Sequence, residues 1–478
     1  MNFNQIVDAV DSFVWGWVLI VLILGAGLLL TVRTRFVQVR HLGKALKYMV
    51  KNEEGGEGEV TSFGALCTAL SATIGTGNIV GVATAIALGG PGALLWMLVA
   101  AFFGMATKYS EGLLAVKYRT VDENGHALGG PFYYIERGIR ERFGGNWKWL
   151  GKLFALFGAL AGLLGIGTIT QVNGVTESAG RLFKGDALFT IGDKSITLAI
   201  VISGAVVTIC AALVILGGIK RIAKVSEVIV PFMAIAYVVF ALVIMFANVK
   251  ALPAAVALVC KTAFSGTALG GAIVGWTVKI AMQKGIGRGI FSNEAGLGSA
   301  PIAAAAAQTK SPVRQGLVTM TGTFIDTIVI CTMTGLSIVL TGAWNPEVTG
   351  ENLEGFAVTA WAWEHGLPHV PGAVTLTLLS VCLAFFAFTT ILGWDYYAER
   401  CVEYLVGGHK KGVLWTYRIL YILAVAVGPY LTVATVWNIA DIFNGLMAFP
   451  NLVALALLSG VVANETKEYF KKKNHDLT

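Results

Sequence analysis

Eleven apolar stretches long enough to cross a lipid bilayer follow one another along this 478-residue chain. They are residues 12–32, 62–88, 93–116, 152–179, 195–217, 226–247, 268–284, 314–341, 371–396, 413–435 and 440–463. A spanning helix needs about 20 predominantly apolar residues, a length that the apolar segments of soluble domains rarely reach. Only 13% of the residues are charged, against about 25% in soluble domains. The sequence therefore predicts an all-α polytopic membrane protein with eleven transmembrane helices.

The basic residues are distributed unevenly between the two sides of the predicted membrane. Of the 35 Lys and Arg, five lie on one side, one lies within a span, and the other 29 lie on or next to the opposite side. Cytoplasmic loops carry the excess of Lys and Arg in membrane proteins. We therefore expect a multi-pass protein of the cell (plasma or inner) membrane, with its N-terminus outside and its Lys-rich C-terminal tail in the cytoplasm. The net charge of +7 reflects this topology and does not indicate nucleic-acid binding.

The second apolar stretch is interrupted near its middle by Gly75, Thr76, Gly77 and Asn78. Each Gly weakens a helix by about 1 kcal/mol relative to Ala, and lipid offers no water to backbone groups that a local unwinding releases. Close helix packing would explain Gly77 and Gly81, which are four residues apart, but not the polar residues between them. The interruption is therefore predicted to lie inside the protein, where unwound backbone presents N–H and C=O groups to a small polar guest.

The ten spans after the first divide into two sets of five, and each set begins with a Gly-interrupted span. In the second set the interruption lies between Ser265 and Trp276. Because five is odd, the second set enters the membrane from the opposite side, as in transporters built from inverted repeats around a midplane site. The predicted organisation is an N-terminal helix with a basic linker (1–58), a first repeat (59–250), a second repeat (251–463) and a cytoplasmic tail (464–478).

Polar side chains at membrane depth are candidates for function. Gln171 in the fourth span could bond both to a carboxylate and to an ammonium group, or simply form an interhelical hydrogen bond. Thr389 and Thr390 in the ninth span offer adjacent neutral oxygens to an alkali cation, although Thr commonly bonds to its own helix. Trp394 follows Thr390 by four residues, so the two side chains share a helical face that would wall a pocket or pack.

Asp326 is the only acidic residue near the middle of any predicted span. Placing an acid there costs about 2.5–3.5 kcal/mol on insertion scales. Three interpretations remain open from the sequence: Asp326 is protonated, it is paired with Lys279, or it belongs to a cation or proton path.

Four segments of the chain carry further information. They are Ala72-Thr-Ile-Gly-Thr-Gly-Asn-Ile79, Gly89-Gly-Pro-Gly-Ala-Leu-Leu-Trp-Met97, Gly129-Gly-Pro-Phe-Tyr-Tyr134 and Arg288-Gly-Ile-Phe-Ser-Asn-Glu-Ala-Gly-Leu-Gly-Ser-Ala-Pro301. In content and order they resemble segments of the alanine or glycine:cation symporter family, and the similarity runs from the first span to the last. The chain departs slightly from the family's Trp-Met-Trp, which reads Trp96-Met97-Leu98 here.

The resemblance implies a leucine-transporter-type core of five plus five helices in inverted repeat, here spans two to eleven, with one extra N-terminal helix. It also implies that backbone groups of the interrupted second span meet the substrate carboxylate, while the seventh span faces the amine and side chain. The substrate-binding residues so implied are Thr73, Gly75, Thr76, Gly77, Asn78, Gln171, Gly271, Ala272, Gly275, Thr390 and Trp394. The implied sodium ligands are Ser71, Ile74, Phe386, Thr389 and Thr390.

The function that the sequence favours is secondary active symport of small neutral amino acids, alanine or glycine, with sodium as the coupling ion and not as a catalytic cofactor. Adjacent threonines without a neighbouring carboxylate favour sodium over protons. The alternatives are a proton-coupled symporter, an ion channel that uses exposed backbone oxygens, and a sensor built on a transporter fold. An enzyme is not expected, because the chain lacks paired catalytic carboxylates, an H-E-x-x-H motif and a convincing Ser/His pair. The sequence does not identify the protein partners.

Overall fold

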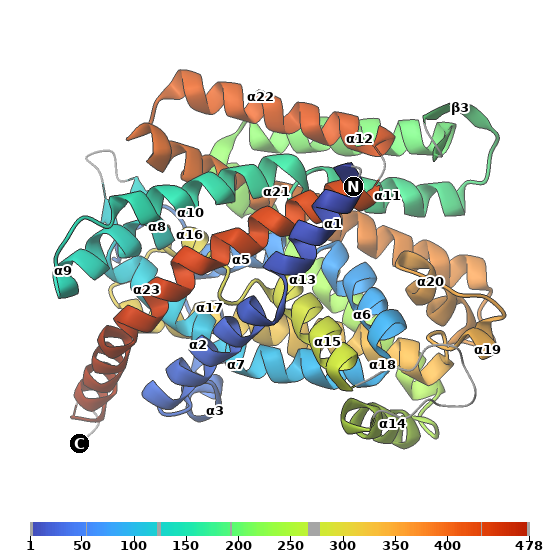
Figure 1. The fold of residues 1–478 in the computed structure, drawn as a ribbon, viewed down its shortest axis with the longest axis horizontal. Helices are drawn as coiled ribbons and strands as arrows, with labels where there is room; N and C mark the ends of the chain where they lie inside the picture. The colour runs from blue at the N-terminus through green and yellow to red at the C-terminus, as the bar shows by residue number, and fades with distance from the viewer. Residues whose placement is uncertain are drawn as a thin grey trace.

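The computed structural model describes residues 3–53, 55–121, 126–191, 194–265, 278–431 and 433–475, and the chain is mostly helical (Figure 1). The elements up to residue 250 are α1 (Phe3–Val14), α2 (Trp17–Arg33), α3 (Val37–Arg40), α4 (Leu42–Val50), α5 (Ser62–Thr73), η1 (Gly77–Gly81), α6 (Val82–Gly89), α7 (Gly92–Lys117), β1 (Thr120–Val121), β2 (Ala127–Leu128), α8 (Pro131–Tyr133), η2 (Tyr134–Gly138), α9 (Ile139–Phe143), α10 (Lys148–Ala161), η3 (Gly162–Ile166), α11 (Ile169–Leu182), β3 (Ala187–Ile191), β4 (Lys194–Thr197), α12 (Leu198–Ile215) and α13 (Gly218–Ala247). The later elements are α14 (Leu252–Phe264), α15 (Val278–Asn293), α16 (Ala300–Ala304), α17 (Pro312–Thr323), η4 (Phe324–Cys331), α18 (Thr332–Thr341), α19 (Pro346–Thr349), α20 (Phe356–His365), α21 (Gly372–Val406), α22 (Lys411–Val427), η5 (Gly428–Tyr430) and α23 (Val433–His475). The four strands form two antiparallel hairpins, β1–β2 and β3–β4.

Within the described residues, nine helical segments are long and apolar enough to cross a membrane, and one bent pair of helices brings the number to ten. The bent pair joins Ser62–Thr73 to Gly77–Gly89 at an angle of 52°. Each of the ten corresponds to one of the predicted spans. The remaining predicted span, 268–284, lies largely outside the described residues, which resume at Val278. The prediction of a helical, polytopic protein is confirmed.

Helix α7 crosses the middle of the molecule and packs against α15 on one side and α17 on the other. Small residues allow the close approach. A Cβ on Gly112 of α7 would lie 2.5 Å from the hydroxyl of Thr319, and one on Gly316 of α17 would lie 2.6 Å from the carbonyl oxygen of Tyr109. Packing of this kind drives helix association in lipid, where burial of apolar surface contributes little.

The bent pair lies against the long helix α21. Helix α5 ends at Thr73, Ile74 has extended backbone angles (φ −78°, ψ 90°), and the chain becomes helical again as the π-helix η1. A Cβ on Gly393 of α21 would lie only 2.6 Å from the backbone nitrogen of Ala72, so the two helices touch just before the break. The predicted interruption of the second span is therefore present, and it lies inside the protein.

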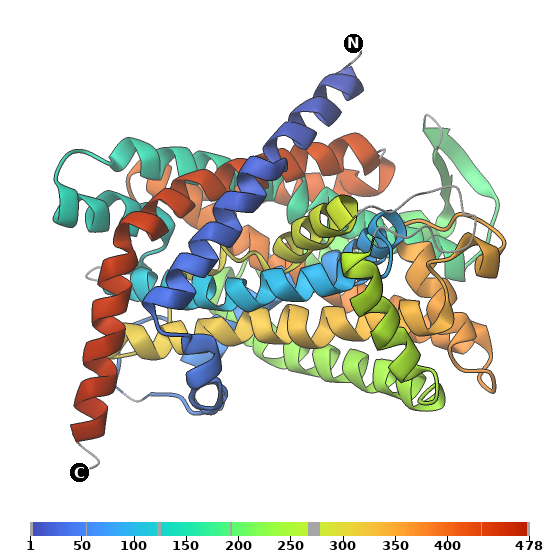
Figure 2. The same ribbon diagram turned by 60° about the horizontal axis from the view of Figure 1, so that its bottom comes forward.

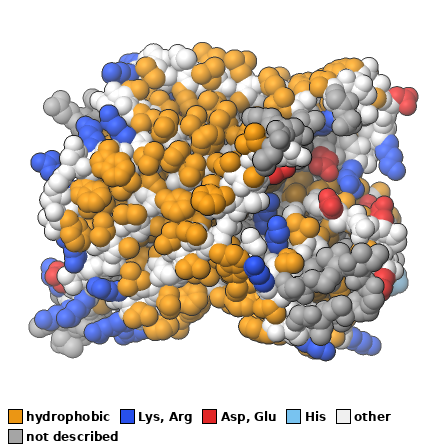
Figure 3. Space-filling model, in the orientation of Figure 1, with side chains coloured by type: hydrophobic (Ala, Val, Ile, Leu, Met, Phe, Trp, Pro, Cys, Tyr) orange, Lys and Arg blue, Asp and Glu red, His pale blue; other side chains and the backbone are white. Residues whose placement is uncertain are grey.

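The elements gather at two ends of the molecule in both ribbon views (Figures 1 and 2). One end carries α3, α9 and the C-terminus, and the other carries the β3–β4 hairpin, α14, α19 and α20. Hydrophobic side chains cover much of the face between them (Figure 3). This is the surface that a protein embedded in lipid requires.

Candidate functional site

The break between α5 and η1 is the centre of the candidate site, because side chains from distant helices bind the backbone groups that it frees. The N–H of Thr76 donates to Oε1 of Gln171 on α11 at 3.2 Å. The carbonyl oxygen of Ile74 accepts a hydrogen bond from the Thr390 hydroxyl of α21 at 3.3 Å. The N–H of Gly75 donates to the side chain of Asn78 at 2.9 Å. All six residues in these three hydrogen bonds are buried.

Gly75 lies in a space that admits no side chain. A Cβ there would lie 2.5 Å from Oγ1 of Thr390 and 3.1 Å from Oε1 of Gln171. The structure thus brings Ile74, Gly75, Thr76, Gln171 and Thr390 together. Gly77 begins η1 directly after the break.

Neutral oxygen atoms converge where α21 passes the break. The carbonyl oxygen of Phe386 lies 3.0 Å from the hydroxyl of Thr389 and 2.9 Å from that of Thr390, and Thr390 also contacts the Ile74 carbonyl. Hard, uncharged oxygens of this kind suit an alkali cation. The hydroxyl of Ser71, one turn before the break, donates to the carbonyl of Thr68 in its own helix at 2.7 Å. The hydroxyl of Thr73 likewise bonds within α5.

Trp394 of α21 lies beside η3 and the start of α11. Its side chain is 1% exposed and packs against Gly162 and Gly167, where the chain breaks between η3 and α11. The break leaves the carbonyl of Ile166 free to accept a hydrogen bond from Nε2 of Gln171 at 2.9 Å, which orients the Gln171 oxygen toward Thr76. The predicted residues Gly271, Ala272 and Gly275 lie outside the described residues.

A second polar network holds the far side of the break. Oδ1 of Asp326 accepts a hydrogen bond from Asn78 at 2.7 Å, and Oδ2 accepts from Ser292 at 2.9 Å and from Thr327 at 2.7 Å. Both polar groups of the Asn78 side chain are therefore bonded within the protein, so Asn78 links the broken span to η4. The sequence singled out Asn78 and Asp326 separately but missed Ser292, which follows a predicted span, and Thr327, which lies within one.

The charged group that faces Asp326 is Lys108 of α7. Lys108 is buried and interacts electrostatically with Asp326, Glu111 and Glu294. Among the described residues, Lys279 makes no ion pair with Asp326, so the pairing considered from the sequence is not formed. Spacing along a single span could not reveal Lys108, because it lies on a different helix.

A cavity of about 410 Å³ leads from the break toward the end of the molecule that carries α20. It is lined by Thr76, Val80, Thr84, Ala87, Leu88, Thr170, Asn173, Gly174, Glu177, Glu354, Gly355, Phe356 and Trp437. Thr76 therefore belongs both to the break and to the cavity, which provides a route between the site and that end.

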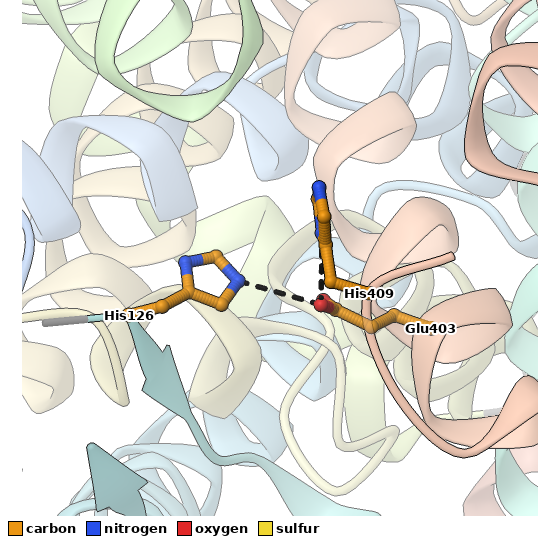
Figure 4. Close-up of side chains that lie close together, drawn as sticks. All are labelled: His126, Glu403 and His409. Atoms are coloured by element: carbon orange, nitrogen blue, oxygen red, sulfur yellow. Dashed lines mark hydrogen bonds and ion pairs between the residues drawn. The ribbon is translucent and has the colours of Figure 1, made fainter. Parts of the chain in front are cut away.

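On the side of the break away from this cavity, a cluster of ion pairs covers the beginning of the broken span. Figure 4 shows three of its residues, His126, Glu403 and His409. His126 in the β1–β2 hairpin segment lies 3.0 Å from Glu59, which precedes α5, and 3.5 Å from Glu403 at the end of α21. His409 lies 3.1 Å from the same Glu403 oxygen. Although the two histidines and Glu403 are close enough to hold a metal ion, the Arg400 guanidinium contacts both His126 and Glu403. The cluster is therefore already neutralised by ion pairs.

His126 gives this cluster a pH dependence. Hydrogen bonds to Glu403 and Glu59 raise the pKa of His126 from 6.5 to about 9. Because the folded-state pKa is raised, the stabilisation is complete below about pH 6.5 and is lost as the pH rises through about 9. We expect His126→Gln to lower the unfolding midpoint by roughly 1–3 °C at pH 7, and the difference from the wild type to disappear near pH 10. Thermal unfolding across this pH range measures it. His369→Gln, at an exposed position, is the control, and a difference that does not change with pH would contradict the prediction.

Comparison with known proteins agrees with this architecture. The model of the sodium:alanine symporter family matches residues 1–478. An uncharacterized transporter of Haemophilus influenzae is 54% identical over 478 residues, covering 99% of this chain and 98% of its own. The sodium/alanine symporter AgcS of Methanococcus maripaludis is 48% identical over 472 residues, covering 98% of both chains. The crystal structure of MhsT in complex with L-phenylalanine shares the fold, with a TM-score of 0.56 over 86% of this chain and 99% of that chain, at 12% identity.

Proposed function

Because the chain belongs to the sodium:alanine symporter family, we propose that it imports small neutral amino acids, alanine and glycine, together with sodium. Transport proceeds by alternating access around the break in the second span. The observation that carries the proposal is the convergence of freed α5 backbone groups with the Gln171 amide and the Thr390 hydroxyl. The similarity to the sodium/alanine symporter AgcS supports the choice of solute and ion.

The amino acid binds through its carboxylate to the N–H groups around Gly75, Thr76 and Gly77. These groups lie at the start of η1, which continues into α6, so the positive end of that half-helix dipole also favours the anion. Gln171 accepts from the Thr76 N–H and lies where it can bond to a bound solute. The remaining residues proposed for the solute site are Thr73, Asn78 and Trp394, together with Gly271, Ala272 and Gly275 of the seventh span.

Sodium binds between α5 and α21, at the carbonyl oxygens near Ser71, Ile74 and Phe386 and the hydroxyls of Thr389 and Thr390. Three hydrogen bonds support this assignment. Both threonine hydroxyls donate to the Phe386 carbonyl oxygen, and the Thr390 hydroxyl also donates to that of Ile74. The ion would join two helices that must move apart when access changes, so its presence would favour the loaded, closed state. At 100 mV one sodium ion supplies about 2.3 kcal/mol, which supports roughly a fiftyfold solute gradient.

We propose that the cavity at Thr76 is the outer route and that the His126 cluster covers the inner one. This orientation follows from the excess of Lys and Arg on the side of the C-terminus. Figures 1 and 2 support it, because the C-terminus lies with α3 and α9 at the end away from α20, whose Phe356 lines the cavity. The five-plus-five inverted repeat and the total of eleven spans belong to the same proposal.

A second candidate, proton-coupled symport, is favoured by one specific observation. Asp326 is a fully buried carboxylate that bonds directly to Asn78 of the broken span. A proton bound there would change the contacts of the same segment that holds the solute. The two carboxylate oxygens of Asp326 already accept three hydrogen bonds, from Asn78, Ser292 and Thr327.

The proposal is tested by the effect of alanine on the thermal stability of the purified protein, with and without sodium. We expect saturating alanine to raise the unfolding midpoint in sodium chloride and to have little effect in choline chloride. A ligand at a hundred times its Kd stabilises by about 2.7 kcal/mol, which is readily measured. Leucine is the size control and should stabilise less. Equal stabilisation by alanine in both salts would contradict sodium coupling, and no stabilisation by alanine or glycine would contradict the proposed solutes.

A further inference from the structure

A basic pocket of about 470 Å³ lies away from the transport site, between the end of α2, the α3–α4 segment and the last turns of α23. Six cationic side chains line it, namely Arg33, Arg35, Arg40, Lys44, Lys467 and Lys471. None of its lining residues, all within the described part of the chain, is acidic. Figure 3 shows Lys and Arg gathered at the lower left, where Figure 1 places α3 and the end of α23.

Within the described residues, no acidic side chain forms an ion pair within 4.0 Å with these six cations. Some arginines elsewhere in the molecule are paired, such as Arg288 with Asp441, Arg400 with Glu403, and Arg418 with Glu399. Six unpaired cations around one concavity produce a strong local positive potential, which favours an anionic ligand.

His41 at the base of the pocket responds to that potential. Burial, together with the charges of Lys44 and Arg40, lowers the pKa of His41 to about 4, so the imidazole is neutral at physiological pH. The neutral imidazole ring stacks on the phenyl ring of Phe470 of α23, with the two ring centroids 3.8 Å apart. The Lys44 ammonium lies over the same phenyl ring, 5.2 Å from its centroid. The pocket is thus a built contact between the two ends of the chain and not a row of separate surface lysines.

The pocket lies at the boundary between lipid and water. Helix α2 exposes Val21, Leu28 and Val32 along its length and ends at Arg33, where the pocket begins. Phe36 and Val39, beside the pocket, are 47% and 60% exposed. Apolar surface that continues directly into an unpaired basic pocket matches a molecule with acyl chains and an anionic head, and it does not match a free soluble anion.

We propose that this pocket binds the phosphate headgroup of an anionic phospholipid, whose acyl chains lie along the exposed face of α2. The bound lipid would join α2 and α4 to α23, and so connect the first span, which lies outside the proposed repeats, to the last helix. It would therefore stabilise the folded protein, whether or not sodium or amino acid is present.

The experiment compares lipids added to the full-length protein purified in a neutral detergent. Phosphatidylglycerol, phosphatidylcholine with the same acyl chains, and inorganic phosphate are titrated separately, with the unfolding midpoint and retention of lipid in native mass spectra as readouts. We expect only phosphatidylglycerol to raise the midpoint and to remain bound. We also expect 0.5 M potassium chloride to weaken its binding, because the Debye length falls to about 4 Å at that ionic strength.

The pocket variant is Arg35→Gln/Arg40→Gln/Lys467→Gln, and its apparent affinity for phosphatidylglycerol should fall at least tenfold. The matched control is Arg140→Gln/Lys148→Gln/Lys152→Gln, which removes the same charge from exposed positions away from the pocket and should bind as the wild type does. If the pocket variant does not fold, Lys467→Gln/Lys471→Gln, at exposed positions of α23, replaces it. Equal stabilisation by both lipids, equal loss in the control, or an equal effect of inorganic phosphate would overturn the proposal.

Discussion

Gly75→Ala is expected to abolish most sodium-dependent alanine binding while leaving the protein folded. The added methyl group would lie 2.5 Å from the Thr390 hydroxyl and 3.1 Å from the Gln171 amide oxygen, so one of these groups must move. Each belongs to the proposed site, one for sodium and one for the solute. Overpacking of this kind costs about 1–3 kcal/mol, which corresponds to an affinity roughly 5- to 150-fold weaker. Isothermal titration of alanine in sodium chloride measures it.

Gly81→Ala provides the control for this substitution. Gly81 ends the η1 segment that begins after the break, but a Cβ there meets nothing within 4 Å. Gly81→Ala should therefore bind alanine as the wild type does. Wild-type affinity in the Gly75→Ala protein would show that the solute does not bind at the break.

Thr390→Val is expected to raise the sodium concentration that half-saturates alanine binding by at least tenfold. Valine keeps the shape of threonine but removes the hydroxyl that contacts the carbonyl oxygens of both Ile74 and Phe386. The proposed site has few ligand oxygens, so the loss of one that joins α21 to α5 should lower the affinity for sodium strongly. The measurement is alanine binding at a fixed alanine concentration over a range of sodium concentrations.

Two further variants separate the loss of a ligand from a general effect on α21. Thr390→Ser keeps the hydroxyl and should restore most of the sodium affinity. Thr377→Val removes a hydroxyl that bonds to the Ala373 carbonyl of the same helix at an exposed position, and should change nothing. An unchanged sodium dependence in Thr390→Val would rule out the proposed cation site.

The sequence predicted the spans and the position of the break because both depend on local properties. Apolar length alone identified ten of the spans now described. The run from Gly75 to Asn78 could be placed at a break because glycine and polar residues are costly within a helix in lipid. Periodicity did not predict the π-helical turns in four of the elements, since their extra residue per turn depends on packing against neighbours.

Contacts between distant residues were beyond the sequence. Gln171 and Thr76 are 95 residues apart, and Asn78 and Asp326 are 248 apart. The residues themselves indicated only polar groups in apolar surroundings, and it was the family resemblance that placed Gln171 and Thr76 in one site. Which side chain meets which backbone group depends on the crossing of α5, α11 and α21. For the same reason the sequence offered Lys279 as a partner for Asp326, whereas the fold places Lys108 near it.

The central claim is that sodium entry drives uptake of a small neutral amino acid, and one measurement tests it directly. Labelled alanine is supplied to proteoliposomes of the purified protein with an inward sodium gradient, an inward proton gradient, or neither. We predict accumulation above the external concentration with the sodium gradient alone. Accumulation with the proton gradient alone would contradict sodium coupling and move the coupling role to Asp326, and no uptake of alanine or glycine under any gradient would contradict the proposed substrate.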